Sequence, residues 1–216
     1  MLTDIFLDLD GTLTDPKVGI TKSIRYAMNQ LGAPLHENFN LDWAIGPSLW
    51  DSFGKMGLKN KDIDKAISHY RERYTDVGLF ENKVYQGIPE ALEILKKNQI
   101  KMYLMTAKPH SYAKKITAYF GLSKFLEYEF GSELNGKNTN KADLIRHALN
   151  FLNISASQSI MVGDRKYDII GAKENFVKTI GVSWGYGTKL ELEKAKPEHL
   201  IKNPDELTTT ILSLTT

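Results

Sequence analysis

The amino-acid sequence predicts an α/β protein, in which a parallel sheet carries helices on both faces and a block of helices is inserted after the first strand. Two observations support this fold class. Short apolar runs alternate with segments of helical spacing through most of the 216 residues, and such alternation is typical of parallel strands joined by helices. Between residues 15 and 83, by contrast, helical patterns follow one another without a convincing strand.

Five short apolar runs are the expected strands. The first, residues 5–9, leads into Asp10 and Gly11, which indicates a buried strand that ends in a turn. The other four are residues 100–105, 128–130, 160–162 and 179–182.

Two of the segments between these runs have a clear helical pattern. Residues 90–98 follow Pro89, which suits the first turn of a helix. Residues 142–152 place one apolar stripe along the helix, made of Leu144, Ile145, Ala148, Leu149 and Leu152. We expect these helices to cover the sheet.

The inserted block is expected to contain three helices. The first carries an apolar stripe from Ile20 to Leu31 and should end at Gly32, a good C-terminal cap. Residues 41–56 and 61–77 have the spacing of two more helices.

The length of the chain allows one core domain with a smaller insert. We expect a core domain made of residues 1–14 and 84–216, and an all-helical inserted domain made of residues 15–83. The hinges are expected near residues 14–17 and 80–87.

Composition excludes several classes of function. The 28 basic and 26 acidic residues give a net charge of only +2, which does not favour binding to nucleic acid or to a membrane surface. The absence of cysteine excludes disulfides, thiolate metal sites and cysteine nucleophiles. No signal peptide and no transmembrane run is recognisable. We therefore expect a cytoplasmic protein without nucleic-acid or membrane partners, as a monomer or homodimer.

The first expected strand ends in the motif Asp8-Leu9-Asp10-Gly11-Thr12. Two residues apart on an extended chain, Asp8 and Asp10 point the same way. The carboxyl end of a parallel strand is the usual ligand crevice of an open α/β sheet. Gly11 permits a sharp turn and leaves backbone N–H groups free to meet a phosphate. An ordinary polar turn is the alternative.

Two further positions could bind a phosphate. Thr106 directly follows the second expected strand, where its hydroxyl and nearby N–H groups could hold phosphoryl oxygens, although a threonine before a helix is often only a helix cap. Lys141 opens the helix of residues 142–152, a place where the helix dipole disfavours a cation. Solvation at the surface or a site with excess negative charge would explain it, and Lys137 is the rival candidate.

The fourth expected strand is followed by Asp164 and Asp168, which are spaced to face one side of a helix start. An acidic first turn stabilised by the helix dipole is the alternative. With Asp8 and Asp10, these residues would bring four carboxylates to one edge of the sheet. So many carboxylates require a cation, and ligands that are all oxygen select a hard ion, most simply Mg²⁺.

The chain resembles the haloacid dehalogenase superfamily, in the branch of phosphoglycolate phosphatases, pyrophosphatases and related nucleotidases. The residues that carry the resemblance are Asp8-Leu9-Asp10-Gly11-Thr12-Leu13, Thr106, Lys141, Gly163-Asp164-Arg165-Lys166-Tyr167-Asp168-Ile169-Ile170-Gly171-Ala172, Gly181-Val182-Ser183-Trp184-Gly185-Tyr186-Gly187 and, in the insert, Ile45-Gly46-Pro47-Ser48-Leu49. The resemblance implies a Rossmann-like core with a helical cap.

The resemblance also implies roles for the residues. Asp8 would be the nucleophile that forms an aspartyl-phosphate, and Asp10 the general acid and base. Mg²⁺ would be held by the Asp8 carboxylate, the Asp10 backbone carbonyl and Asp164. Asp168 would support this site, together with Gly11 and Thr12.

The phosphoryl group would be bound by Thr106, Ala107 and Lys141. Ala107 stands where relatives often have Asn or Ser, so one side-chain contact with the phosphate is expected to be missing. An aspartate at position 10 favours hydrolysis of a phosphate ester or anhydride, or a phosphomutase, over the family's other chemistries. The substrate expected by analogy is a small phosphorylated metabolite, such as phosphoglycolate or a nucleoside monophosphate. A regulator that binds phosphorylated ligands without catalysis is the remaining alternative.

Overall fold

The computed structural model describes residues 2–215, which divide into two compact units. One unit contains the chain up to Asp15 and from Val84 onward, and the other is Pro16–Lys83. Within the described residues, no helix is both long enough and apolar enough to cross a membrane.

The first unit is built on a parallel sheet of six strands in the order β5-β4-β1-β6-β7-β8. The strands are β1 (Asp4–Leu7), β4 (Lys101–Pro109), β5 (Tyr128–Ser132), β6 (Ser159–Gly163), β7 (Lys178–Val182) and β8 (His199–Ile201). After β1 the chain builds one side of the sheet with β4 and β5, and then the other side with β6, β7 and β8. Strand order therefore reverses at β1, which is where ligands bind in open α/β sheets.

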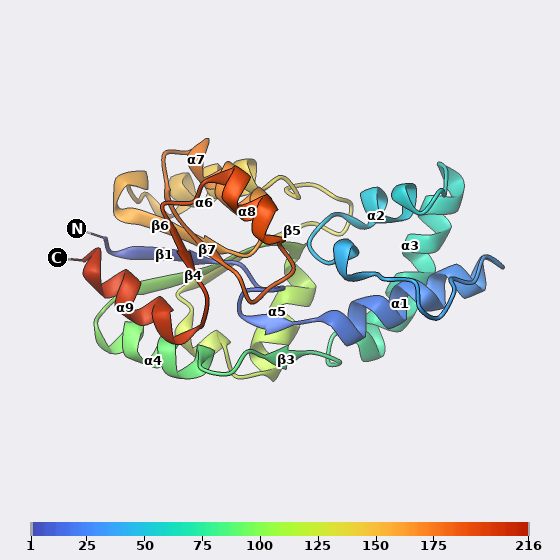
Figure 1. Ribbon diagram of the computed structural model, residues 1–216, viewed down its shortest axis with the longest axis horizontal. Helices are drawn as coiled ribbons and strands as arrows, with labels where there is room; N and C mark the ends of the chain where they lie inside the picture. The colour runs from blue at the N-terminus through green and yellow to red at the C-terminus, as the bar shows by residue number, and fades with distance from the viewer. Residues whose placement is uncertain (1, 216) are drawn as a thin grey trace. The chain divides into compact units, whose positions relative to one another are not determined.

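Helices cover both faces of this sheet (Figure 1). One face packs against α6 (Lys141–Leu152) and α7 (Lys166–Lys173), and Phe6, Met105 and Met161 lie in that core. Because side chains alternate along a strand, their neighbours face the opposite layer, where Figure 1 shows α4 (Ile88–Lys97), α5 (His110–Tyr119) and α9 (Asp205–Ser213). These neighbours are fully buried as well, as expected for a sheet with two covered faces: Ile5, Leu7, Leu104, Ile160 and Val162.

The second unit, Pro16–Lys83, consists mainly of helices. Its helices are α1 (Lys17–Gln30), the 3₁₀ turn η1 (Asp42–Ala44), α2 (Leu49–Lys55), α3 (Lys61–Arg73) and the π-helical turn η2 (Tyr74–Gly78). Gly32 follows α1 with a φ of +70°, as expected of its C-terminal cap. The parallel sheet of the first unit and this helical insert confirm the predicted fold class, a Rossmann-like core with an inserted helical domain.

One predicted helix of the insert is wrong. Residues 41–56 do not form a continuous helix, because η1 and α2 are separated by Ile45–Ser48. Gly46 has a φ of +105°, which no helix allows, and Pro47 cannot donate a helical hydrogen bond. The predicted helix of residues 61–77 also changes its winding after Arg73, where η2 begins.

A two-stranded ribbon, β2 (Thr14–Asp15) with β3 (Lys83–Val84), was not predicted. Strands of two residues have no periodicity that a sequence pattern could reveal. The ribbon matters for connectivity, because the chain passes from the first unit to the second after Asp15 and returns before Val84. Both connections between the units therefore run through it.

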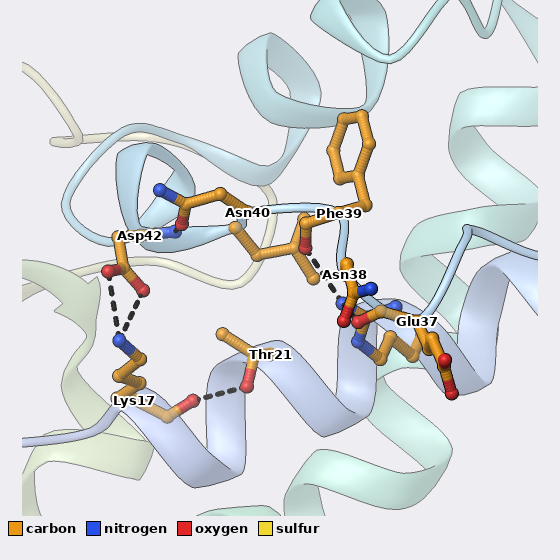
Figure 2. Close-up of a pocket in the computed structure, with 9 residues that line it drawn as sticks. Lys17, Thr21, Glu37, Asn38, Phe39, Asn40 and Asp42 are labelled. Atoms are coloured by element: carbon orange, nitrogen blue, oxygen red, sulfur yellow. Dashed lines mark hydrogen bonds and ion pairs between the residues drawn. The ribbon is translucent and has the colours of Figure 1, made fainter.

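A polar pocket of about 200 Å³ lies within the helical unit (Figure 2). Lys17 of α1 forms an ion pair with Asp42 there, at 2.7 Å. Arg25 donates hydrogen bonds to the carbonyls of His36, Glu37 and Phe39 and so ties the segment after α1 onto that helix. The pocket is lined by none of the residues predicted for catalysis, phosphate binding or metal binding, and three of its lining residues, Lys17, Arg25 and Asp42, are engaged in these contacts.

Candidate active site

The side chain of Asp8 lies directly beyond β1, where it meets a buried lysine. The Asp8 backbone N–H donates to Val162 of β6 at 3.0 Å, which holds the carboxylate at the carboxyl edge of the sheet. Lys141, the first residue of α6, reaches across and places its Nζ 3.0 Å from Asp8 Oδ1 and 2.7 Å from Asp168 Oδ1. The carbonyl of Met105 is its third oxygen partner and accepts a hydrogen bond from this ammonium at 2.8 Å. Three oxygen partners thus explain why a lysine is tolerated at a buried helix N-terminus.

The ammonium of Lys141 is charged at any ordinary pH. Burial by itself would lower the pKa of Lys141, but the carboxylates of Asp168 and Asp8 outweigh burial and raise this pKa above its usual value. Lys141 is only 6% exposed, so water screens its charge very little. Lys141 is therefore a fixed positive charge beside Asp8.

The two aspartates that pair with Lys141 belong to a cluster of three buried carboxylates. Asp8, Asp164 and Asp168 each offer an oxygen, and these three oxygens lie within 4.8 Å of one another. Asp164 is completely buried, and burial followed by repulsion from Asp168 and Asp8 raises its pKa well above the usual value. Burial raises the pKa of Asp168 to about 6, although Lys141 opposes the shift. One ammonium does not balance three carboxylates, so the cluster could hold a metal ion.

The turn after β1 brings its backbone against Asp164. Gly11 has a φ of +84°, and a Cβ at this position would lie 2.2 Å from Asp164 Oδ2. Only glycine satisfies both the turn and this close approach. The hydroxyl of Thr12 donates to Asp164 Oδ1 at 3.4 Å. Asp168 is held from its own helix, because the N–H of Arg165 donates to Asp168 Oδ2 at 3.0 Å.

Asp10 has a different partner from Asp8. Its Oδ2 lies 2.7 Å from the Nζ of Lys108, a residue of β4 that is 9% exposed. Its Oδ1 is buried and has no hydrogen-bond partner among residues 2–215. Burial raises the pKa of Asp10, and Lys108 opposes that shift. A carboxyl with one free oxygen and a raised pKa is suited to carry a proton.

Lys108 was not among the residues predicted for the site. A signal was available, because Lys108 stands two residues after Thr106 on the same strand, and residues i and i+2 of a strand point to the same side. The strand was expected to end at residue 105, so this relation was hidden. In the structure β4 extends to Pro109 and carries both residues.

Thr106 and Ala107 lie inside β4, which removes the alternative that Thr106 caps a helix. Helix α5 begins only at His110, and its N-cap residue is Pro109. The Thr106 hydroxyl is 2% exposed and accepts a hydrogen bond from the Lys108 N–H at 3.2 Å. The carbonyl of Ala107 accepts from Ser132 of β5 at 2.7 Å. Both residues sit at the carboxyl half of a strand next to β1.

The structure thus places the predicted site residues at the ends of three adjacent strands and at the start of α6. Asp8, Lys141, Asp164 and Asp168 form one buried charged cluster, and Asp10 forms a separate pair with Lys108. Lys137, the rival of Lys141, is exposed. A doubly wound α/β sheet with such a cluster at its switch point defines an enzyme of the α/β class.

The chain belongs to the haloacid dehalogenase-like hydrolase family, which it matches over residues 5–182. It is 41% identical to a 5'-nucleotidase of Pseudomonas aeruginosa, over 91% of this chain and 89% of that protein. It is 34% identical to the tyrosine-protein kinase PtkA of Mycobacterium tuberculosis, over 85% of this chain and 62% of that protein. The crystal structure of "a predicted phosphatase from Clostridium acetobutylicum" superposes with a TM-score of 0.94 at 38% identity and covers 99% of both chains. The predicted family and enzyme class, a phosphatase of this family, are confirmed.

Proposed function

We propose that this chain is a Mg²⁺-dependent phosphatase that hydrolyses a small phosphate monoester through an aspartyl-phosphate on Asp8. The observation that carries the proposal is the buried cluster, in which Asp8 is paired with the fixed charge of Lys141 and stands beside a second aspartate with a free oxygen. A nucleophile, a proton carrier and an anion-binding cation are thereby present at one sheet edge.

The donor set of the cluster fits Mg²⁺. All of its side-chain ligands are carboxylate oxygens, which a hard cation prefers. We propose that Asp8, Asp164 and the backbone carbonyl of Asp10 hold the ion and that Asp168 supports them. When bound, Mg²⁺ would neutralise charge on the phosphoryl oxygens and on Asp8, which otherwise repel each other.

In the first step, an oxygen of Asp8 attacks phosphorus as the bond between phosphorus and the leaving oxygen breaks. The electron pair of that bond goes to the leaving oxygen, which takes a proton from Asp10. Lys141 holds the phosphoryl group with its ammonium, and Thr106 and Ala107 are the proposed partners of the other phosphoryl oxygens.

In the second step, water attacks phosphorus and the bond between phosphorus and Asp8 breaks. Asp10 takes the proton from the water, so that inorganic phosphate leaves and both aspartates return to their first state. The free Oδ1 of Asp10 is the atom that we propose to carry the proton in both directions.

The substrate that we propose to test first is a nucleoside 5'-monophosphate, with phosphoglycolate as the second choice. The support comes from relatives that cover most of this chain and are named 5'-nucleotidase and phosphoglycolate phosphatase. We also propose that residues 15–83 act as a cap that selects the leaving group, with residues 1–14 and 84–216 as the catalytic core.

A panel of phosphate-release assays tests the proposal. Nucleoside monophosphates, phosphoglycolate, pyrophosphate and sugar phosphates are each incubated with Mg²⁺ and with EDTA. We expect release from at least one monoester, abolished by EDTA and restored by added Mg²⁺. Activity that EDTA leaves intact would exclude the metal. Isomerisation of a sugar phosphate that needs a bisphosphate activator would instead identify a phosphomutase, and release from no substrate would favour a binding protein.

Replacement of Lys108 by methionine is expected to move the alkaline limb of the kcat/KM profile to higher pH. Lys108 lowers the pKa of Asp10 through its charge and its hydrogen bond, so its removal raises this pKa further. A general acid with a higher pKa stays protonated to higher pH. The measurement is kcat/KM against pH at saturating Mg²⁺. A limb that moves to lower pH, or does not move, would contradict the assignment of Asp10 as the acid.

A further inference from the structure

The loop of residues 183–188, between β7 and α8 (Lys189–Ala195), lies against Asp164. A Cβ at Gly185 would lie 2.4 Å from Asp164 Oδ2 and 2.3 Å from the carbonyl oxygen of Gly11. A Cβ at Gly187 would lie 1.8 Å from the carbonyl oxygen of Asp164. Two glycines therefore bring the backbone between them into direct contact with this carboxylate.

The residue between these glycines is Tyr186, whose backbone N–H donates to Asp164 Oδ2 at 2.7 Å. A hydrogen bond to a carboxyl oxygen that is fully buried is costly to lose, and this one fixes the orientation of Asp164. Its backbone origin means that it forms only if the loop keeps its place. The orientation of Asp164 therefore depends on what anchors the loop.

The anchor is the phenol of Tyr186. Its O–H donates to the carboxylate of Asp15, the last residue of β2. Tyr85, the residue after β3, also hydrogen-bonds with the side chain of Tyr186. A second contact supports the loop, because Trp184 Nε1 donates to the carbonyl of Thr12 at 3.1 Å. One residue thus touches a site carboxylate with its backbone and the connecting ribbon β2–β3 with its side chain.

We propose that Tyr186 is a positioning residue that couples the orientation of the Asp164 carboxylate to the β2–β3 ribbon. Since both chain connections to the helical unit run through this ribbon, a displacement of the ribbon changes the place of the Tyr186 phenol and, through the loop, the hydrogen bond to Asp164. The inference rests on the proposed role of Asp164 as a ligand of the cation.

The experiment measures Mg²⁺ binding to the full-length protein by calorimetry, without substrate. Tyr186→Phe keeps the backbone N–H and the ring but loses the phenol, and Asp15→Ala removes its acceptor. We expect each to weaken Mg²⁺ binding by about 3- to 10-fold, as for the loss of one hydrogen bond. The double variant should bind no more weakly than the weaker single variant, because both remove the same contact. Asp15→Asn keeps an acceptor oxygen and should restore binding.

Tyr128→Phe is the matched control, since Tyr128 lies on the edge strand β5, is 41% exposed and belongs to no part of the site. It should bind Mg²⁺ as the natural protein does. In steady-state assays, Tyr186→Phe should lower the apparent affinity for Mg²⁺ and leave the KM of the phosphorylated substrate nearly unchanged at saturating Mg²⁺.

Two outcomes separate this inference from the proposed function. Unchanged Mg²⁺ affinity in Tyr186→Phe and Asp15→Ala, with tight binding to the natural protein, would overturn the coupling and leave the proposed function standing. Additive losses in the double variant would likewise overturn it. A natural protein that does not bind Mg²⁺ would overturn both. If Asp15→Ala does not fold, Tyr186→Phe and Asp15→Asn still decide the matter.

Discussion

Replacement of Asp8 by asparagine is expected to lower kcat/KM by at least about 10⁴-fold while the protein stays folded. The amide of asparagine cannot attack phosphorus as a carboxylate does. The substitution also removes one negative charge from a cluster of three buried carboxylates, two of which pair with Lys141, so we expect the fold to be kept. The measurement is phosphate release with the best substrate of the panel, together with a thermal unfolding curve.

Asp143→Asn is the matched control for Asp8→Asn. Asp143 lies in the first turn of α6, pairs with Arg146 and has a side chain that is 60% exposed. The substitution makes the same chemical change within the same unit and should leave kcat/KM within about 2-fold of the natural value. Near-normal turnover by Asp8→Asn would contradict the assignment of Asp8 as the nucleophile. In a second test, acid quenching with labelled substrate should trap no phosphoprotein in this variant.

Replacement of Lys141 by methionine is expected to lower the free energy of unfolding by about 3–5 kcal/mol, because it breaks a buried ion pair and removes one partner. Asp8 and Asp168 would then lie in the same buried cluster without the ammonium that links them. The loss should be larger at pH 8 than at pH 5. Burial raises the pKa of Asp168 to about 6 even beside Lys141. Without this lysine, the pKa of Asp168 should rise further. For a carboxyl whose pKa is raised by folding, the loss of stability grows as the pH rises from the unfolded-state pKa to the folded-state pKa. At pH 5 this loss is only partly developed, and at pH 8 it is larger.

Urea unfolding of Lys141→Met at both pH values checks this prediction, with Lys137→Met as the control. Lys137 is exposed, so its loss should change stability by no more than about 0.5 kcal/mol. The variant Lys141→Met/Asp168→Asn should recover part of the loss, since it removes one of the unpaired carboxylates. Equal stabilities of the Lys141→Met and Lys137→Met variants would show that the buried pair is not a source of stability.

The regular elements of the core were predictable because each has a local signal. Residues 160–162 are a fully buried strand and are apolar throughout, and residues 142–152 repeat apolar side chains at the helical period. Elements without such a signal were missed. The ribbon strands are two residues long, and β8 (His199–Ile201) is three residues long and includes a histidine. Residues 41–56 had an apolar pattern, but Gly46 and Pro47 break the helix.

The partners of the site residues could be predicted only in part. The convergence of Asp8, Asp164 and Asp168 follows from the rule that carboxyl ends of parallel strands meet at one edge. That rule does not predict which lysine pairs with which aspartate. Lys108 and Lys141 both reach the site. In the structure Lys108 forms an ion pair with Asp10, and Lys141 forms ion pairs with Asp8 and Asp168. Asp10 and Lys108 are 98 residues apart in the chain, Asp8 and Lys141 are 133 apart, and Lys141 and Asp168 are 27 apart, so no local pattern encodes these pairs.

The fold class and the family could be predicted from the sequence, and so could Asp8 and Asp10 as candidates, because these predictions depend on hydrophobic periodicity and on a compact motif. Two features are visible only in the folded chain: Asp10 keeps one oxygen free, and Tyr186 joins Asp164 to Asp15. Both facts are consequences of burial and of distances between segments far apart in the chain. Hydrogen bonds of this kind depend on atoms meeting within about 3 Å, a condition that the order of residues does not express.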